Sequence, residues 1–186
     1  MPAAISEYMP QLASDKESAR RRRAAFVAWG AVVFCAALSV AAVVVAPMAR
    51  AGGWPLLSVV IYGAFHAACH QMPERSFYVA GYPLAVCARC FGLYVGALAG
   101  LIAYPLVRPM ARTDAPWRGW LLIASLPTTV DFALGLFGVW ENTHWSRFST
   151  ALVAGAASAF YVVPGLVDLS LSKFRRPAEG FCPAGV

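Results

Sequence analysis

The stretch that decides the fold is RRRRAAFVAWGAVVFCAALSVAAVVVAP, residues 20–47. Four arginines precede 24 residues without a charge, and a helix that crosses a bilayer needs about 20 mostly apolar residues. Because positive residues beside a span stay in the cytoplasm, the pattern predicts a transmembrane helix over residues 24–47 with a cytoplasmic N-terminus. Residues 1–23 are then a polar, basic N-terminal tail. A cleavable signal peptide is disfavoured, because its apolar region is shorter and has no long polar segment before it.

The composition of the whole chain agrees with this first span. Hydrophobic residues make up 60% of the 186 residues, charged residues make up 13%, and the mean hydropathy is +0.61. These values lie outside the usual range of a soluble domain. The length leaves room for few crossings, so we expect an all-α integral membrane protein with four to five transmembrane helices.

Four further apolar segments follow the first, at residues 54–70, 90–107, 119–139 and 148–169. We expect residues 54–169 to form a membrane core domain and residues 170–186 to form a C-terminal tail. The segment at 54–70 has only 17 residues and ends in a histidine, which is marginal for a full crossing. It either crosses the membrane or is re-entrant and returns to the side it started from.

The placement of Lys and Arg favours the re-entrant alternative. A full crossing would divide the 15 positive residues almost evenly between the two sides, whereas cytoplasmic flanks normally collect them. A returning segment places eleven of them in the cytoplasm and leaves Arg50, Arg75, Arg89 and Arg147 outside. We therefore expect a multi-pass protein of the cell inner (cytoplasmic) membrane. In either topology two spans separate residues 87–90 from residues 140–147, so these loops meet on one side.

Cysteine and histidine gather around one predicted loop. Cys69 and His70 precede the loop, and Cys87-Ala88-Arg89-Cys90 follows it. A Cys-x-x-Cys turn can direct two thiolates at one tetrahedral metal ion. The pattern predicts a zinc site with the ligands Cys69, His70, Cys87 and Cys90, on the outer face. His66 is a less favoured alternative to His70 because it lies farther from the loop.

The same cysteines allow other chemistry. On an oxidising face they could form a disulfide, and Arg89 could lower a thiol pKa and make that cysteine reactive. They could also be ordinary small apolar residues, as we expect for Cys35 and Cys182. A covalent c-type haem is disfavoured because Phe91, not histidine, follows Cys90.

An intramembrane carboxylate and three arginines form a second predicted cluster. Asp131 lies inside an apolar span, where an ionised group needs a partner, and Arg75, Arg89 and Arg147 are the candidates. Together they would make a pocket for an anionic or lipid-like ligand. The plainer alternatives are a buried ion pair at Asp131 and an Arg147 that only reaches to the interface. Residues predicted to rim the pocket are Glu141, Asn142 and His144.

Two other patterns carry structural predictions. Gly92, Gly96 and Gly100 recur every four residues, which allows close packing of transmembrane helices. The arginine run at 20–23 is better explained by contact with lipid than by nucleic acid, and no partner other than the lipid bilayer is indicated for it. The oligomeric state is not encoded in any pattern.

The loop motifs resemble a family of predicted bacterial and archaeal membrane proteins of unknown function. The resemblance rests on a CHxxPxRSF motif that begins at Cys69 and a CARCxGxYxG motif that begins at Cys87, and it extends to Asp131 and Arg147. Phe132 and Ala151 stand where that pattern has glycine. The resemblance covers roughly residues 60–165 and implies a shared site, but no activity.

Three functions fit these features. The first is an integral membrane protein whose zinc site fastens the loop beside a pocket for an anionic ligand. The second is an enzyme, either a membrane thiol–disulfide oxidoreductase or a metal-assisted hydrolase. The third is a small component of a metal or metallocofactor transporter, because interrupted helices often line transporter sites. We favour the first, since the sequence specifies ligands better than substrates.

Overall fold

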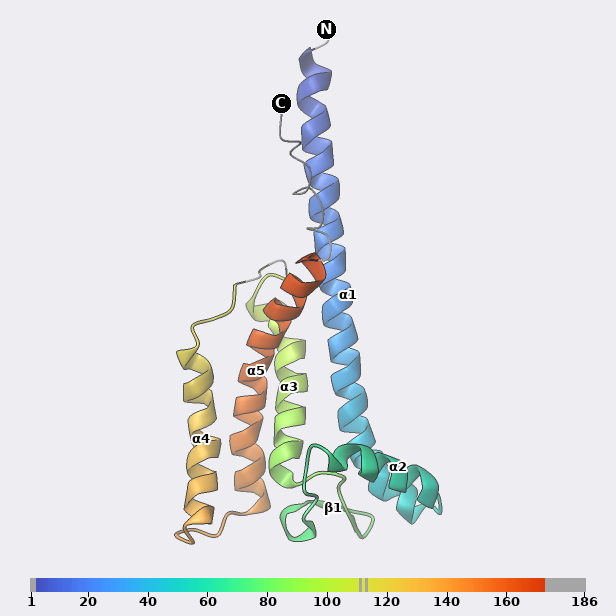
Figure 1. Ribbon diagram of the computed structural model, residues 1–186, viewed down its shortest axis with the longest axis vertical. Helices are drawn as coiled ribbons and strands as arrows, with labels where there is room; N and C mark the ends of the chain where they lie inside the picture. The colour runs from blue at the N-terminus through green and yellow to red at the C-terminus, as the bar shows by residue number, and fades with distance from the viewer. Residues whose placement is uncertain (1–2, 111, 113, 173–186) are drawn as a thin grey trace, which may run out of the picture.

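Figure 1 shows the computed structural model of the chain, which describes residues 3–110, 112 and 114–172. The helices are α1 (Ala3–Ala51), α2 (Pro55–His66), α3 (Ala88–Val107), α4 (Gly119–Leu136) and α5 (His144–Ser172). A 3₁₀ turn η1 (Pro73–Arg75) and a hairpin of β1 (Tyr78–Val79) and β2 (Tyr82–Pro83) lie between α2 and α3. The predicted tail at 170–186 falls beyond the described residues from position 173 onward.

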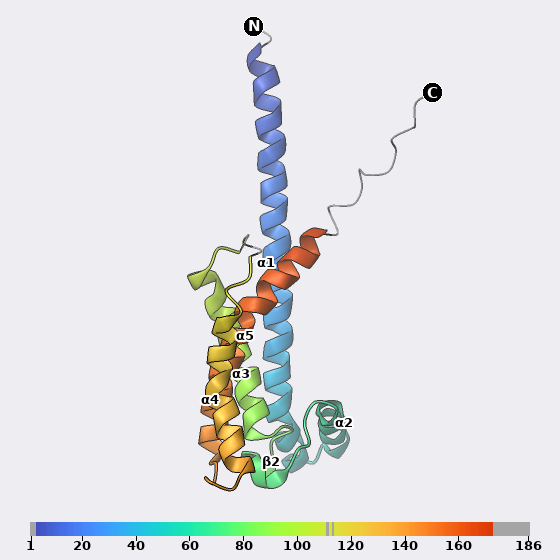
Figure 2. The same cartoon turned by 60° about the vertical axis from the view of Figure 1, so that its left-hand side comes forward.

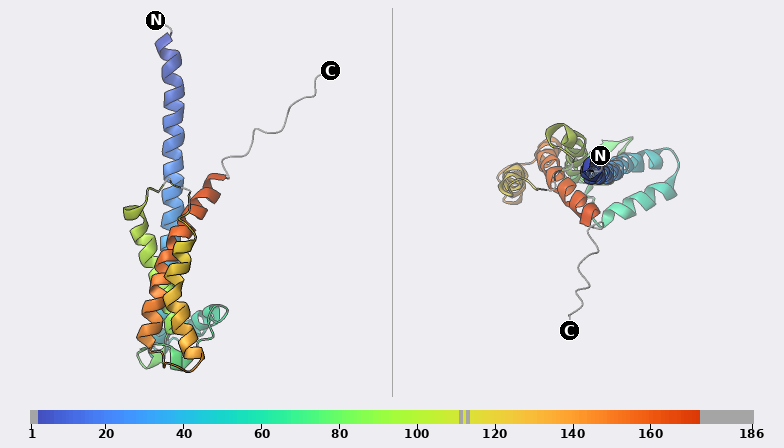
Figure 3. Two further views of the ribbon diagram at one scale, coloured as in Figure 1. Left: turned by 90° about the vertical axis from the view of Figure 1, so that its left-hand side faces the viewer. Right: turned by 90° about the horizontal axis from the view of Figure 1, so that it is seen from above.

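Within the described residues, four helices are long and apolar enough to cross a membrane: α1, α3, α4 and α5. The predicted all-α membrane fold is therefore confirmed, with four candidate spans. Helix α2 has only 12 residues and is about 18 Å long, well short of the roughly 30 Å hydrocarbon core. It lies across the bundle axis at the end that carries the hairpin (Figures 1 and 3). The segment at 54–70 thus returns to the side it started from.

The helix ends differ from the predicted limits in ways that matter for the site. Helix α3 begins at Ala88 and α5 at His144, each earlier than predicted, and α4 ends at Leu136 rather than 139. Arg89 and Arg147 therefore lie in first helical turns, and Asp131 is about 7.5 Å from the end of α4. Helix α1 continues through the predicted tail and first span without a break, and it projects beyond the bundle (Figure 1).

The chain runs down α1, up α3, down α4 and up α5 (Figures 1 and 2). The loop between α3 and α4, with Arg108, Arg112 and Arg118, thus lies at the end towards which α1 projects. The loop between α4 and α5 lies with the hairpin and α2 at the other end. The topology with a re-entrant segment at 54–70 predicted this arrangement of the two loops. Lys173, Arg175 and Arg176 lie outside the described residues.

Glycines bring α3 and α5 into backbone contact. A Cβ atom added to Gly92 or Gly96 would overlap the carbonyl oxygen of Phe148 or Leu152, and one added to Gly100 would lie 2.9 Å from the Ala156 Cα. The packing role predicted for these glycines is therefore confirmed. The two helices are parallel, so both begin at the end that carries the hairpin (Figure 1).

Helix α1 completes the core along its length. Trp29 donates a hydrogen bond from Nε1 to the Leu101 carbonyl oxygen, 2.8 Å away, and the buried Ala25 packs with Leu101 and Val163. Near the hairpin, Val43 packs against Cys69 and other loop residues. Helix α4 packs on α5 at the edge of the bundle (Figure 3).

We predict that Gly96→Ala lowers the free energy of unfolding in detergent by about 1–3 kcal/mol, the usual cost of overpacking. The reason is the clash of the new Cβ with the backbone of α5. Gly30→Ala on α1 is the matched control, since nothing lies within 4 Å of its Cβ position and alanine favours a helix. Circular dichroism melts of both variants provide the comparison. Equal melting temperatures would contradict a tight α3–α5 contact.

Candidate metal and anion site

Residues 67–87 form a loop that supplies part of the site. Gln71, near the start of this loop, is hydrogen-bonded both to α2 and to the last residues of the loop. The Gln71 side-chain amide donates to the carbonyl oxygens of Tyr62 (2.7 Å) and Ala85 (2.8 Å). Its backbone has φ = 53°, a left-handed conformation that non-glycine residues rarely adopt. The sequence analysis missed Gln71, because an isolated glutamine in a loop carries no motif.

A tight hairpin closes the loop. Tyr78 pairs with Pro83 and Val79 with Tyr82, so Ala80 and Gly81 form a two-residue turn in which both φ values are positive, 51° and 83°. This is the geometry of a type I′ turn. The Tyr62 hydroxyl donates to the Pro83 carbonyl oxygen, which anchors the hairpin to α2.

Phe77 fixes the loop to the helices. Its ring contacts Phe91 of α3 and the rings of His144, Trp145 and Phe148 of α5, with centroids 5.2–6.4 Å apart. Aromatic pairs at this spacing add stabilisation beyond the burial of their area. The loop is therefore positioned against the first turns of both helices. His144, predicted as a rim residue, serves in this aromatic contact.

The loop and α3 bring three cysteines together. The sulfur atoms of Cys69, Cys87 and Cys90 lie within 4.8 Å of one another; Cys69 is buried and the other two are half-buried. Zinc–sulfur bonds of about 2.3 Å in a tetrahedron separate sulfur atoms by about 3.8 Å. The donor set and spacing thus fit a zinc ion after a small contraction.

Two of these sulfur atoms accept hydrogen bonds. The backbone N–H groups of Gln71 and Cys87 donate to the Cys69 sulfur over 3.5 and 3.3 Å. A hydrogen bond from Cys90 lowers the pKa of Cys87 below its ordinary value, although desolvation by burial opposes this. Donors to a sulfur favour its charged form, which is the form that binds metal.

The two histidines lie differently from the cysteines. His70 is exposed and lines the cavity beside Cys69, but its ring is not in the group of ligand atoms within 4.8 Å. His66 is exposed at the end of α2 and is not among the lining residues. A fourth ligand from His70 therefore stays a prediction.

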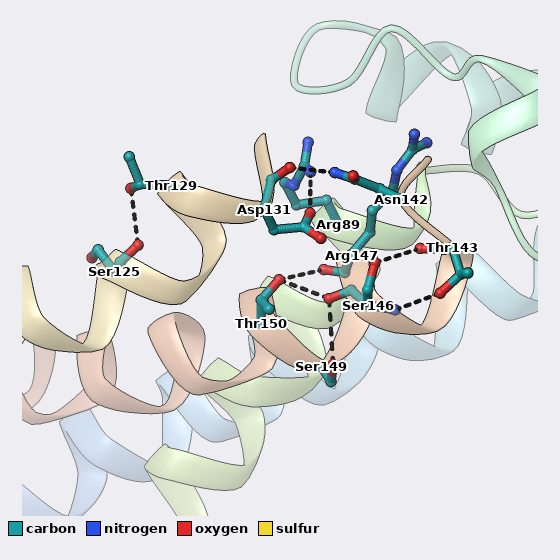
Figure 4. A network of polar contacts seen from close by, with 10 residues as sticks. All are labelled: Arg89, Ser125, Thr129, Asp131, Asn142, Thr143, Ser146, Arg147, Ser149 and Thr150. Carbon is teal, nitrogen blue, oxygen red and sulfur yellow. Dashed lines mark hydrogen bonds and ion pairs between the residues drawn. The ribbon is translucent and has the colours of Figure 1, made fainter. Parts of the chain in front are cut away.

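Asp131 pairs with Arg89. The Arg89 Nη2 and Asp131 Oδ2 atoms are 2.5 Å apart, and the two side chains are 23% and 9% exposed. The Asn142 side-chain amide donates to the Asp131 backbone carbonyl oxygen. The Arg89 guanidinium lies over the Phe132 ring, 5.3 Å from its centroid, which is a cation–π contact. Of the three arginines considered as partners of Asp131, the structure pairs it with Arg89. Figure 4 shows this junction of α3, α4 and α5.

A cavity of about 340 Å³ joins the cysteines to the arginines. Its lining includes all the predicted metal ligands and the three predicted arginines. Asp131 is not a lining residue but contacts the lining residue Arg89. Glu141 is exposed and lies outside the lining. The lining residues are Ala68, Cys69, His70, Gln71, Met72, Arg75, Cys87, Arg89, Cys90, Phe132 and Arg147.

Among the described residues, two donor atoms of the cavity-lining side chains are buried without a partner, namely the Nε atoms of Arg89 and Arg147; the Asn142 Oδ1 atom nearby also has none. Figure 4 shows both side chains extending from the starts of α3 and α5. Buried donors normally have acceptors, so the cavity offers unused hydrogen-bonding capacity for a ligand.

We predict that Asp131→Asn lowers the free energy of unfolding by about 3 kcal/mol or more, because it leaves the Arg89 charge without its carboxylate in a partly buried position. Asp114 is the comparison, because it is 57% exposed and pairs with both Arg108, at 3.0 Å, and Arg112, at 2.8 Å. Asp114→Asn should cost less than about 1 kcal/mol. Unfolding in a detergent titration measures both. Similar small losses in the two variants would show that the Arg89–Asp131 pair contributes little.

Residues 69–161, half of the chain, match the family described as "Predicted membrane protein (DUF2085)". The chain is 38% identical over 122 residues to an uncharacterized protein of Methanocaldococcus jannaschii, covering 66% of this chain and 78% of that protein. It is 38% identical over 95 residues to an uncharacterized protein of Methanothermobacter thermautotrophicus, covering 51% and 84%. No solved structure matches the chain. The match begins at Cys69 and includes α3, α4 and the start of α5, and the chain belongs to this family of predicted membrane proteins.

Proposed function

We propose that the protein is a membrane metal-binding protein in which a zinc ion fastens the loop to the start of α3, beside a pocket for an anionic or lipid-like ligand. The convergence of Cys69, Cys87 and Cys90 within 4.8 Å carries this proposal. Residues 18 apart in the chain are brought together by packing, and three sulfur donors suit zinc. The metal's role is structural, because it links the loop to the bundle.

His70 supplies the fourth ligand in this proposal. It follows Cys69 directly and lines the same cavity. Without His70, the fourth position would be open to the cavity and could hold water, as in catalytic zinc sites. The arginine-lined side of the cavity would then face the metal.

We predict about one zinc ion per chain in protein purified in detergent, measured by elemental analysis. The Cys87→Ser/Cys90→Ser variant should lose the metal, and chelation should lower the melting temperature of the unmodified protein, because metal binding contributes to folding. Cys35→Ser is the control, since Cys35 is exposed on α1 and lies outside the cluster. His70→Ala should weaken zinc binding and leave the fold intact.

A protein that is fully folded, free of metal and carries all its thiols reduced would rule out the zinc site. Two fewer free thiols than expected, again without metal, would instead support the second candidate, a thiol–disulfide oxidoreductase. The proximity of the three sulfur atoms favours that candidate next. Titration of free thiols on the same sample separates the two results.

We further propose that the protein lies in the cytoplasmic membrane with its N-terminus in the cytoplasm and the cysteine site on the outer face. The support is the unequal charge of the two ends. Among the described residues, the positive ones at the end towards which α1 projects are Lys16, Arg20, Arg21, Arg22, Arg23, Arg108, Arg112 and Arg118, whereas Arg50, Arg75, Arg89 and Arg147 lie at the site end. Positive flanks normally face the cytoplasm.

We predict that a membrane-impermeant thiol reagent added to intact cells labels Glu74→Cys but not Ala115→Cys. Both positions are exposed, one at each end of the bundle. The unmodified protein gives the background from its own cysteines, and cell lysis should make Ala115→Cys reactive. Labelling of Ala115→Cys alone in intact cells would reverse the orientation.

A further inference from the structure

The cavity is lined by more positive charge than the nearby carboxylate neutralises. Arg75, Arg89 and Arg147 all line it. Of these three, only Arg89 has a carboxylate partner among the described residues, namely Asp131. Three guanidinium groups against one carboxylate leave two positive charges. A zinc ion held by three thiolates would add one negative charge, so the excess remains positive.

Two helix starts increase this excess. Helices α3 and α5 begin side by side at the cavity, and neither has an acidic residue in its first turn. Arg89 and Arg147 occupy those turns instead. A helix start carries about half a positive charge and is normally stabilised by anions. Placing arginines there is unfavourable unless an anion binds between them.

The direction of the arginines favours a phosphate over a carboxylate. One guanidinium can bind both oxygens of a carboxylate side by side, although Arg89 contacts only one oxygen of Asp131. Here the donors come from three elements, the η1 turn, α3 and α5, and the Nε atoms of Arg89 and Arg147 are unused. A terminal phosphate has three oxygens in different directions and close to two negative charges at pH 7.

The wall of the cavity at α4 points to a membrane source for this phosphate. Phe132 lines the cavity and is 50% exposed, on a helix in which Asp131 alone is buried. The volume of about 340 Å³ equals that of about ten waters, more than one phosphate needs. An alkyl chain that leaves past Phe132 would enter the bilayer directly.

We propose that this cavity binds the phosphomonoester headgroup of an anionic membrane lipid, held by Arg75, Arg89 and Arg147, with its acyl chains along α4. This rests on the proposed function for the existence of an anion pocket, and it specifies the ligand. The three guanidinium groups match the three terminal oxygens of a phosphomonoester, whereas a phosphodiester has only two free oxygens and would leave a guanidinium unused.

The test uses the full-length, delipidated protein in neutral detergent, titrated with short-chain phosphatidic acid and followed by native mass spectrometry. Phosphatidylglycerol with the same chains should bind at least about tenfold more weakly. Arg147→Gln and Arg75→Gln should each weaken phosphatidic acid binding about tenfold or more, since each removes a charge-assisted hydrogen bond. Arg75 is exposed on the loop, so its variant keeps the test valid if Arg147→Gln fails to fold.

Arg50→Gln is the matched control, because Arg50 lies at the same end of the bundle but outside the cavity, over the Tyr82 ring. Unchanged binding in this variant supports the cavity, and an equal loss would overturn it in favour of general surface charge. Equal affinity for phosphatidylglycerol would overturn the phosphomonoester. Inorganic phosphate that competes as well as the lipid would overturn the membrane source.

Zinc content measured on the same samples separates this inference from the proposed metal site. Protein that holds zinc but does not bind phosphatidic acid would overturn the lipid inference alone. Protein that binds the lipid through the arginines but holds no zinc would overturn the metal site and support the inference.

Discussion

The close contact between the backbones of α3 and α5 is the constraint on which the site depends. Glycines at 92, 96 and 100 leave no room for a side chain between the helices, so their separation and register are fixed by backbone atoms. Because the two helices are parallel, their first turns lie next to each other at one end (Figure 1). That contact places Cys87, Arg89 and Cys90 of one helix beside Arg147 of the other.

The remaining parts of the site are attached to this pair of helices by polar contacts. Helix α4 lies at the edge of the bundle and is joined near its end by the Arg89–Asp131 ion pair and by Asn142. The loop is held by Gln71 and by the packing of Phe77 against both helices. Breaking an ion pair that is partly removed from water is costly, so this single pair contributes strongly to holding α4 against α3.

The proposed metal site and the proposed anion site occupy one region. In the proposed zinc site, thiolates at the start of α3 would reduce the positive charge there, and the same helix start carries Arg89. Binding of a metal by the cysteines and binding of an anion by the arginines therefore act on one electrostatic region. The region lies at the end of the spans, where a headgroup and an apolar chain can both be accommodated.

The sequence determined the features that follow from length, composition and local spacing. Apolar runs of about the length that the bilayer requires predicted four to five spans, and the glycine repeat predicted a packed face. The Cys-x-x-Cys pattern and the charged residues near the spans predicted which side chains gather at one end. Because side-chain chemistry is local, Cys69, Cys87, Cys90, Arg75, Arg89 and Arg147 could be chosen without a structure.

Only the tertiary structure decided which of these residues meet. It ended α2 after 12 residues and turned it back, paired Asp131 with Arg89 rather than Arg75 or Arg147, and left the ring of His70 outside the group of three sulfur atoms. It also revealed Gln71, whose amide spans two loop arms. These outcomes depend on how helices that are far apart in the chain pack together. The spacing of residues along the chain carries no information on the distances between packed helices.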